Sequence, residues 1–319
     1  MNRTPVTNEA APRGGGDMRR APQGIDLVLR RERLEARALS PNSAEPRPFL
    51  RWAGSKRALL KQMVASLPSQ FRTYYEPFLG SGALFFLLCP SQGFLSDKCS
   101  ELITVYTTIR DNVDAIVRHL KPLKPDRDLF YAIRNHPSRG KLKHVADFLY
   151  LNKTCWNGLY RVNSAGRFNV PYGMPKSESI VDFDNLRACA QVLQAPGVTL
   201  GACDFAEALT HVKEGDLVYL DPPYVTRHNN NGFTDYNETL FSWEDQKRLA
   251  KRARALAERG AYVLVTNADH REVLDLYRGF TSRILTRSST LASAAKYRVQ
   301  VREALLCSPN CCAGDAHSV

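Results

Sequence analysis

From Pro48 onward, short apolar runs alternate with segments that have the periodicity of amphipathic helices. After its first residue, the run Asp216–Leu220 is continuously apolar, as in a strand buried on both faces of a sheet. Ser242–Asp245 has the pattern of a helix capping box, and leucine and alanine then recur at helical spacing as far as Gly260. Residues 261–266 form the next apolar run. Strand, loop, helix and strand make a βαβ unit, so the pattern predicts an α/β fold with a mainly parallel sheet.

A similar alternation occurs earlier in the chain. Glu76-Pro-Phe-Leu-Gly80-Ser-Gly82 follows a short strand pattern and precedes the apolar segment 83–88. Glycines at a strand-to-helix turn let the backbone approach a ligand, although ordinary tight turns also use them. Gly93–Ser96 resembles a second strand, and Asp97 follows it. A carboxylate there can accept hydrogen bonds from ribose hydroxyls, and it can also serve as the N-cap of the next helix.

The strongest chemical signal is the loop Asp221-Pro222-Pro223-Tyr224, directly after a predicted strand. Ligands bind beyond the carboxyl ends of parallel strands, which places Asp221 and Asn267 on one functional edge. The two prolines remove backbone donors and stiffen the loop. If Asp221 and the Pro222 carbonyl accept the two N–H groups of a base amine, the lone pair of that nitrogen is freed to attack an electrophilic methyl. Tyr224 can stack on the base. A proline turn without chemistry is the alternative.

Positive charge is concentrated between Arg110 and Lys176. The whole chain has a net charge of +12, and this stretch holds 13 Lys and Arg against 5 Asp and Glu. Aromatic and amide residues interleave with the basic ones. Basic residues bind phosphates, while amides and aromatics read bases or wedge between them. The composition predicts an inserted nucleic-acid-binding module, with a solvated helical subdomain as the alternative.

The remaining composition is that of an ordinary globular protein, with 44% hydrophobic and 24% charged residues. No apolar run approaches the roughly 18 residues of a membrane span, and no apolar signal core opens the chain. The eight cysteines have no regular spacing. Cys307, Cys311, Cys312 and His317 lie close together but lack paired CxxC spacing, so we expect no metal site.

Several motifs together resemble the Dam-type, or D12-class, DNA adenine N6-methyltransferases, which are site-specific. In chain order they are Trp52-Ala-Gly-Ser-Lys56, Glu76–Gly82, Asp97, Leu151–Asn163, Gly166–Gly173, Asp221–Tyr224 and Phe233–Tyr236. The resemblance covers about residues 48–306. It implies a Rossmann-like class I methyltransferase core with a mostly helical target-recognition domain inserted between its two halves. It also implies an orphan or restriction-modification enzyme that methylates the N6 amine of a flipped adenine.

The resemblance also implies roles for individual residues. The cofactor S-adenosyl-L-methionine is expected to contact Trp52, Lys56, Glu76, Gly80, Gly82, Asp97 and Asp221. Asp221, Pro222 and Tyr224 are expected to be catalytic, and Trp156, Asn157 and Arg161 to contact DNA. Lys56 can neutralise the carboxylate of the cofactor, and Arg161 can bind guanine through two hydrogen bonds. For Trp156, a place in the hydrophobic core is the alternative.

These motifs divide the chain into five parts. The expected parts are a disordered basic tail (1–47) with a short helix around Ile25–Ala38, a cofactor-binding part (48–112), the recognition domain (113–196), a catalytic part (197–306) and a C-terminal tail (307–319). The expected partner is double-stranded DNA, with no membrane and no metal. We expect a monomer located in a prokaryotic cytosol or nucleoid.

Some residues depart from the family pattern, and other functions share parts of it. Met174-Pro175 stands where members that read GATC commonly have a basic residue, so the resemblance does not establish that site. Enzymes that methylate the N4 amine of cytosine tend to begin the catalytic loop with Ser, and those acting on RNA or protein amides with Asn. Asp221 therefore favours adenine. A DNA-binding protein with an inactive methyltransferase fold is a further alternative, against which the intact Lys56, Asp97 and Tyr224 argue.

Overall fold

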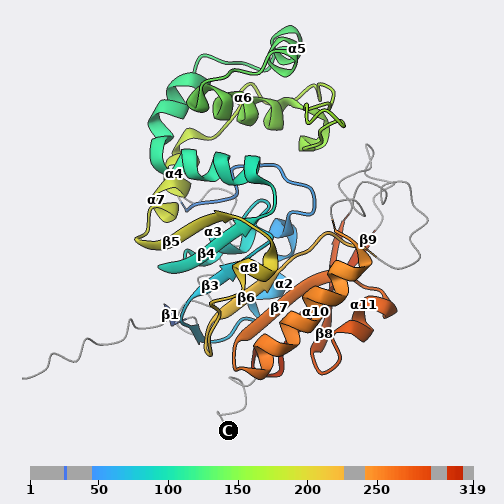
Figure 1. The fold of residues 1–319 in the computed structure, drawn as a ribbon. Helices are drawn as coiled ribbons and strands as arrows, with labels where there is room; N and C mark the ends of the chain where they lie inside the picture. The colour runs from blue at the N-terminus through green and yellow to red at the C-terminus, as the bar shows by residue number, and fades with distance from the viewer. Residues whose placement is uncertain (1–24, 27–44, 226–240, 289–299, 312–319) are drawn as a thin grey trace, which may run out of the picture.

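A mixed, seven-stranded sheet forms the centre of the molecule, in the order β5-β4-β3-β6-β7-β9-β8 (Figure 1). The computed structural model describes residues 25–26, 45–225, 241–288 and 300–311. The strands of the sheet are β3 (Tyr74–Glu76), β4 (Gln92–Asp97), β5 (Gly197–Ala202), β6 (Leu217–Leu220), β7 (Tyr262–Ala268), β8 (Thr281–Ser288) and β9 (Gln300–Cys307). Neighbours from β5 to β7 are parallel, and β9 lies antiparallel between β7 and β8. The predicted α/β fold with a mainly parallel sheet is confirmed.

Helices pack on the sheet through two separate hydrophobic clusters. The helices are η1 (Lys56–Leu59), α2 (Leu60–Val64), α3 (Ala83–Leu88), α4 (Ser100–Leu120), α5 (Arg127–Asn135), α6 (Lys141–Thr154), η2 (Trp156–Gly158), α7 (Phe183–Leu193), α8 (Phe205–Ala208), α10 (Trp243–Glu258), α11 (Arg271–Leu276) and η4 (Pro309–Cys311). One cluster joins side chains of α2, α3, α4, α6 and α7, and the other joins those of α8, α10 and α11. In Figure 1, α10 and α11 lie across β7 and β9.

Local sequence rules account for the β6-α10-β7 unit. All four residues of β6 are buried, because the strand pairs in parallel on both sides. Helix α10 begins with the predicted capping box, in which Ser242 Oγ accepts from Asp245 N at 3.1 Å and Asp245 Oδ2 accepts from Ser242 N at 3.0 Å. Such a cap stabilises a helix by about 1 kcal/mol. Gly260, at a φ of +88°, turns the chain back into β7.

The order of the strands in the sheet reverses beside β3, and this reversal creates a binding crevice. The chain builds outward from β3 to β4 and β5, and then restarts on the other side of β3 with β6 and β7. At such a switch point the connections at the carboxyl ends of adjacent strands diverge and leave space for a ligand. The carboxyl ends of β3, β4 and β6 therefore mark the functional edge.

The segment between β4 and β5 is mostly helical. Its helices α5 and α6 lie away from the sheet, in green at the top of Figure 1, while α7 returns beside β5. Helix α4 runs through the expected boundary at residue 113 and is kinked beside it, at Asn112 (φ −143°, ψ 32°). After α6 the chain forms a loop with isolated antiparallel bridges between Cys155 and Tyr172 and between Val162 and Phe168. We call residues 113–196 the insert.

Two local expectations differ from the structure. Asp97 is the last residue of β4 and not the N-cap of α4, which is Cys99; Asp97 Oδ1 instead accepts the Cys99 N–H at 3.0 Å. Ile25–Asp26 is a short strand, β1, paired antiparallel with β2 (Gln70–Phe71), where the sequence suggested the start of a helix. Pairing satisfies its backbone hydrogen-bonding groups. The rest of that helix, and the motif at 233–236, lie outside the described residues. In the described ranges, no helix is both long and apolar enough to span a bilayer.

Candidate active site

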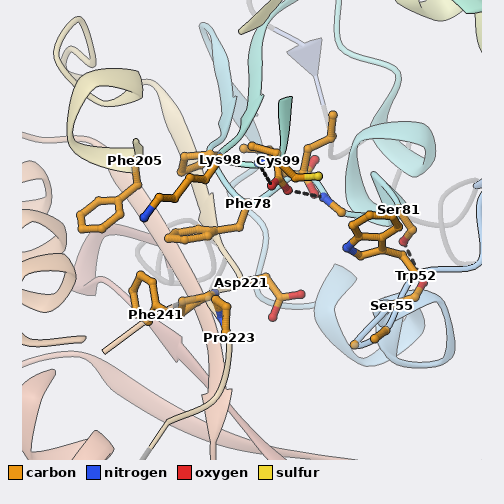
Figure 2. A pocket seen from close by; sticks show the side chains of 18 of the residues that line it. Trp52, Ser55, Phe78, Ser81, Lys98, Cys99, Phe205, Asp221, Pro223 and Phe241 are labelled. Atoms are coloured by element: carbon orange, nitrogen blue, oxygen red, sulfur yellow. Dashed lines mark hydrogen bonds between the residues drawn. The ribbon is translucent and has the colours of Figure 1, made fainter. Parts of the chain in front are cut away.

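A cavity of about 760 Å³ opens at the carboxyl edge of β3, β4 and β6 (Figure 2). The structure brings most of the predicted cofactor and catalytic residues to its wall: Trp52, Lys56, Glu76, Gly80, Asp97, Asp221, Pro222 and Tyr224. They come from four separate segments of the chain, which the sheet assembles at one edge. A volume of several hundred Å³ suits a small organic ligand.

Gly82 does not line this cavity. It precedes α3 with a φ of +63°, and a Cβ there would lie 3.2 Å from the hydroxyl of Tyr106. That hydroxyl donates to the carbonyl of Gly80 at 3.0 Å. Gly82 therefore allows the turn after β3 to pack closely on α4.

Two carboxylates lie deep in the wall. Asp97 accepts hydrogen bonds from the backbone N–H of Gly80 at 3.1 Å and of Cys99 at 3.0 Å, and burial raises its pKa. Glu76 is 2% exposed, and it accepts a hydrogen bond from the Tyr74 hydroxyl at 2.9 Å. Burial raises the pKa of Glu76 well above its ordinary value. These bonds orient both side chains.

Three phenylalanines gather at one end of the cavity, and Trp52 lies at the other, with Asp221 between them (Figure 2). The ring of Phe78 lies 5.7 Å from that of Phe205 and 5.6 Å from that of Phe241. The planes of Phe78 and Phe241 are inclined by 82°, so the cluster offers a planar ligand both the face and the edge of aromatic rings. The sequence did not single out Phe78 or Phe205 for this purpose.

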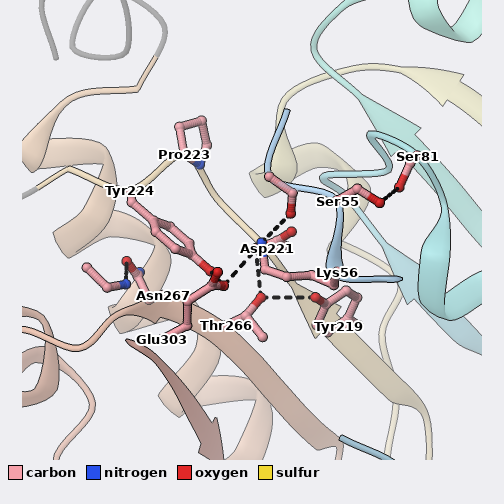
Figure 3. A network of polar contacts seen from close by, with 12 residues as sticks. Ser55, Lys56, Ser81, Tyr219, Asp221, Pro223, Tyr224, Thr266, Asn267 and Glu303 are labelled. Carbon is pink, nitrogen blue, oxygen red and sulfur yellow. Dashed lines mark hydrogen bonds and ion pairs between the residues drawn. The ribbon is translucent and has the colours of Figure 1, made fainter. Parts of the chain in front are cut away.

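Asp221 is held through only one of its oxygens (Figure 3). Its Oδ1 lies 2.7 Å from Lys56 Nζ and accepts a hydrogen bond from Thr266 Oγ1 at 2.7 Å. The hydroxyls of Thr266 and Tyr219 are 3.0 Å apart. Among the described residues, none donates to Oδ2. Burial raises the pKa of Asp221, and the ion pair with Lys56 opposes that effect only in part.

Glu303, which the sequence gave no reason to select, completes this network. It is 1% exposed on β9 and accepts from the Tyr224 hydroxyl at 2.5 Å and from Arg287 Nε at 2.7 Å. Lys56 Nζ is 3.6 Å away. Burial alone would raise the pKa of Glu303, but Lys56, Tyr224 and Arg287 outweigh it and hold the pKa below its ordinary value. Two cations thus balance two carboxylates beside the catalytic loop.

Asn267 does not line the cavity, although the sequence places it at the same edge. It is fully buried, and its Nδ2 donates to Gln246 Oε1 at 3.0 Å. Gln246, on α10, donates in turn to the Pro223 carbonyl at 2.9 Å. The two amides therefore connect β7 to the catalytic loop and fix the position of its second proline. A glutamine on the apolar face of α10 was the only sequence signal for this contact.

The residues expected to contact DNA lie outside the cavity, on the insert. Trp156 is 47% exposed, so the alternative that it belongs to the core is wrong. Asn157 is exposed with a φ of +53°. Arg161 is also exposed, and its Nε donates to Asn169 Oδ1 at 2.8 Å. These side chains are accessible to a macromolecular partner.

Cys307 and Cys311 are buried side chains near the end of β9. Cys307 ends β9 and is buried, and the buried Cys311 has its Sγ 3.3 Å from the Ser308 hydroxyl. Cys312 and His317 lie outside the described residues. In the part of the chain that the structure describes, no group of His, Cys, Asp and Glu is arranged to hold a metal ion.

Comparisons with known proteins identify the family. Residues 52–290 match the model of the D12 class N6 adenine-specific DNA methyltransferases. The chain is 31% identical over 276 residues to a type II methyltransferase of Lactococcus lactis subsp. cremoris (84% of this chain, 97% of the other). It is 35% identical over 260 residues to a type II methyltransferase of Methanocaldococcus jannaschii (74% and 89%), and 30% over 265 residues to the DNA adenine methylase of Haemophilus influenzae (81% and 92%).

Among solved structures, a putative RNA methyltransferase from Pyrococcus horikoshii covers 88% of this chain and 97% of its own. Its TM-score of 0.36 and 9% identity are too low to bear on fold or function. The family model and the sequence relatives, together with the acidic diproline loop at the carboxyl end of β6, give one consistent answer. The chain belongs to the D12 class of N6 adenine-specific DNA methyltransferases.

Proposed function

We propose that this DNA methyltransferase uses S-adenosyl-L-methionine, bound in the 760 Å³ cavity, to methylate an adenine rotated out of duplex DNA. The observation that carries the proposal is the state of Asp221. Its Oδ1 is bound by Lys56 and Thr266, while no described residue donates to its Oδ2, and Asp221 lines the cavity together with Tyr224. A fixed carboxylate with one available oxygen is suited to accept a hydrogen bond from an exocyclic amine.

The residues of the cavity fit this methyl donor chemically. The phenylalanine cluster suits the adenine ring of the donor, and the Asp97 carboxylate suits its ribose hydroxyls. Trp52 and Lys56 then remain for the amino-acid part. Lys56 is already paired with Asp221, so we assign it a second role, which is to orient that carboxylate.

The protein contributes position and hydrogen bonds to the reaction. When bound, the donor would supply a sulfonium methyl whose bond to sulfur breaks as the amine nitrogen bonds to its carbon, so that S-adenosylhomocysteine is the leaving group. Asp221 Oδ2 and the Pro222 carbonyl accept the two N–H groups of the target amine, which draws its lone pair out of conjugation with the ring. Tyr224, held by Glu303, stacks on the base. Asp221 Oδ2 then accepts the proton that the methylated amine loses, a step that its raised pKa favours.

We further propose that the insert holds the DNA. Its exposed Trp156 can wedge into the base stack, and Arg161, oriented by Asn169, can read a guanine. The neighbouring Met174 is 80% exposed, where relatives reading GATC commonly carry a basic residue.

The proposed function predicts one product. Incubation of the full chain with DNA and S-adenosyl-L-methionine labelled with tritium in the methyl group should place the label in N6-methyl-2′-deoxyadenosine. Digestion to nucleosides followed by chromatography identifies the labelled base. Label in cytosine, or no label in DNA, would contradict the proposal. Methylation-sensitive sequencing of DNA from an expressing host would then give the recognition site.

Replacing Gln246 by leucine should lower kcat about fivefold and leave the KM for the donor nearly unchanged. The substitution removes the hydrogen bond that fixes the Pro223 carbonyl, and one buried hydrogen bond contributes about 1 kcal/mol. Steady-state kinetics of methyl incorporation measure both constants. Lys247→Ala, which removes only an exposed ion pair with Glu244, serves as the control. An unchanged kcat in Gln246→Leu would show that the amide pair does not position the loop.

A further inference from the structure

Two residues of the insert reach the cavity of the catalytic core. Tyr160 and Val162 line the cavity, whereas Arg161 between them is exposed. Consecutive side chains of an extended segment point to opposite sides. The same short run therefore presents a candidate base-reading side chain outward and two cavity-lining side chains inward.

Tyr160 stacks on Trp52. The ring centroids are 5.4 Å apart and the planes are inclined by 18°. On another side, Trp52 packs against the turn after β3, where a Cβ on Gly80 would lie 3.0 Å from Trp52 Cδ1. Tyr160 also contacts Phe148 of α6 and Phe168, at centroid distances of 5.3 and 6.1 Å. The rings thus connect the Gly80 turn to the interior of the insert.

The backbone next to Trp52 is attached to the insert as well. Arg51 N donates to Asn152 Oδ1 at 2.9 Å, and Asn152 Nδ2 donates to the Arg51 carbonyl at 2.7 Å. Asn152 is only 2% exposed. Gly158 lies so close that a Cβ there would approach Arg51 Cβ to 2.3 Å. The loop that carries Trp52 is therefore held by the insert through its backbone and through its ring.

We propose that Tyr160 belongs to the binding site of the methyl donor, and that its stack on Trp52 couples donor binding to DNA binding. The proposal rests on the proposed use of S-adenosyl-L-methionine in this cavity. A donor that fixes Trp52 also fixes Tyr160, and hence the run that carries Arg161. The coupling must be reciprocal, because each ligand changes the affinity of the other by the same factor. An aromatic pair contributes roughly two- to tenfold to an equilibrium constant, which sets the expected size.

The test measures this factor directly in the full chain. The dissociation constant of S-adenosylhomocysteine, which permits no turnover, is determined by calorimetry with and without a saturating duplex. The duplex carries the site found by methylation-sensitive sequencing. In the wild type the duplex should tighten binding roughly two- to tenfold. The ratio of the dissociation constants without and with the duplex should fall to about one in Tyr160→Ala and Tyr160→Leu. It should keep its wild-type value in Tyr160→Phe, because the ring is retained.

Two controls keep the outcomes distinct. Tyr131→Leu removes another half-buried insert tyrosine that does not line the cavity, and it should keep the wild-type ratio. Thermal unfolding shows whether the variants remain folded, and Tyr160→Leu retains apolar volume if the alanine variant does not. A wild type that binds no S-adenosylhomocysteine would refute the proposed donor itself. A wild type that binds it with no effect of the duplex, or a Tyr160→Leu ratio equal to that of the wild type, would refute the coupling alone.

Discussion

Replacing Asp221 by alanine should reduce methyl transfer to adenine by about 100- to 1,000-fold, the loss typical when one preorganised group at the reacting atom is removed. Asp221 lines the cavity, Lys56 and Thr266 fix its orientation through Oδ1, and no described residue donates to its Oδ2. Without it, the target amine loses a hydrogen-bond acceptor and the acceptor of its proton. Incorporation of tritiated methyl groups into DNA measures the loss.

The control for this experiment is another carboxylate. Asp275 is 54% exposed in surface ion pairs with Arg271 and Arg278, so Asp275→Ala should retain wild-type activity. Calorimetry with S-adenosylhomocysteine shows whether Asp221→Ala still holds the ligand, which separates a loss of chemistry from a loss of binding. Equal incorporation by the wild type and Asp221→Ala would remove Asp221 from the mechanism.

Replacing Glu303 by glutamine should lower the free energy of unfolding by about 3 kcal/mol and also lower kcat. Removing one partner of a buried ion pair leaves charge uncompensated, and such changes typically cost about 3 to 5 kcal/mol. In the variant, Lys56 would keep its ion pair with Asp221 but lose the one with Glu303. Arg287 would lose the carboxylate that it contacts. Tyr224 would also exchange a charged acceptor for a neutral one, so its ring would be held less firmly. Urea unfolding and steady-state kinetics measure the two effects.

The effect of Glu303 on stability should depend on pH in one direction. The pKa of Glu303 is lowered in the folded protein, so its stabilising contribution is complete above its unfolded pKa of about 4.3. That contribution is lost as the pH falls through the lower folded pKa. The stability difference between wild type and Glu303→Gln should therefore shrink in acid. The exposed Glu258→Gln serves as the control, and a difference that grows on acidification would contradict this assignment.

The sequence predicts the parts of the site that local rules govern. The acidic diproline loop after β6 and the carboxylate at the end of β4 follow directly from strand patterns and from the geometry of parallel sheets. The capping box of α10 needs only four adjacent residues. Each of these features depends on neighbours in sequence, and the structure places each where the pattern predicts it.

The remaining parts depend on contacts between distant segments. Glu303 reaches Lys56 only because β9 enters the sheet beside β7, and no local pattern announces that pairing. In β7, alternation turns Thr266 toward Asp221 and Asn267 toward Gln246 of α10. Both faces of this strand are buried, so hydrophobicity does not reveal which residue faces the site. Asp97 does not have the alternative role of a helix cap, because β4 extends through it as its last residue.

The position of β9 has a consequence for biosynthesis. Among the strands that the structure describes, β9 comes latest in sequence, yet it occupies an inner place between β7 and β8. While residues 300–307 are still inside the ribosome, the edge of β7 that pairs with β9 is exposed. Exposed strand edges promote aggregation. The folded part of the chain then also lacks Glu303, so Lys56 and Asp221 are already present while the charge balance of the catalytic edge is incomplete. A competent catalytic edge is therefore expected only after β9 has joined the sheet, and chains that lack residues 300–307 should have no methylating activity.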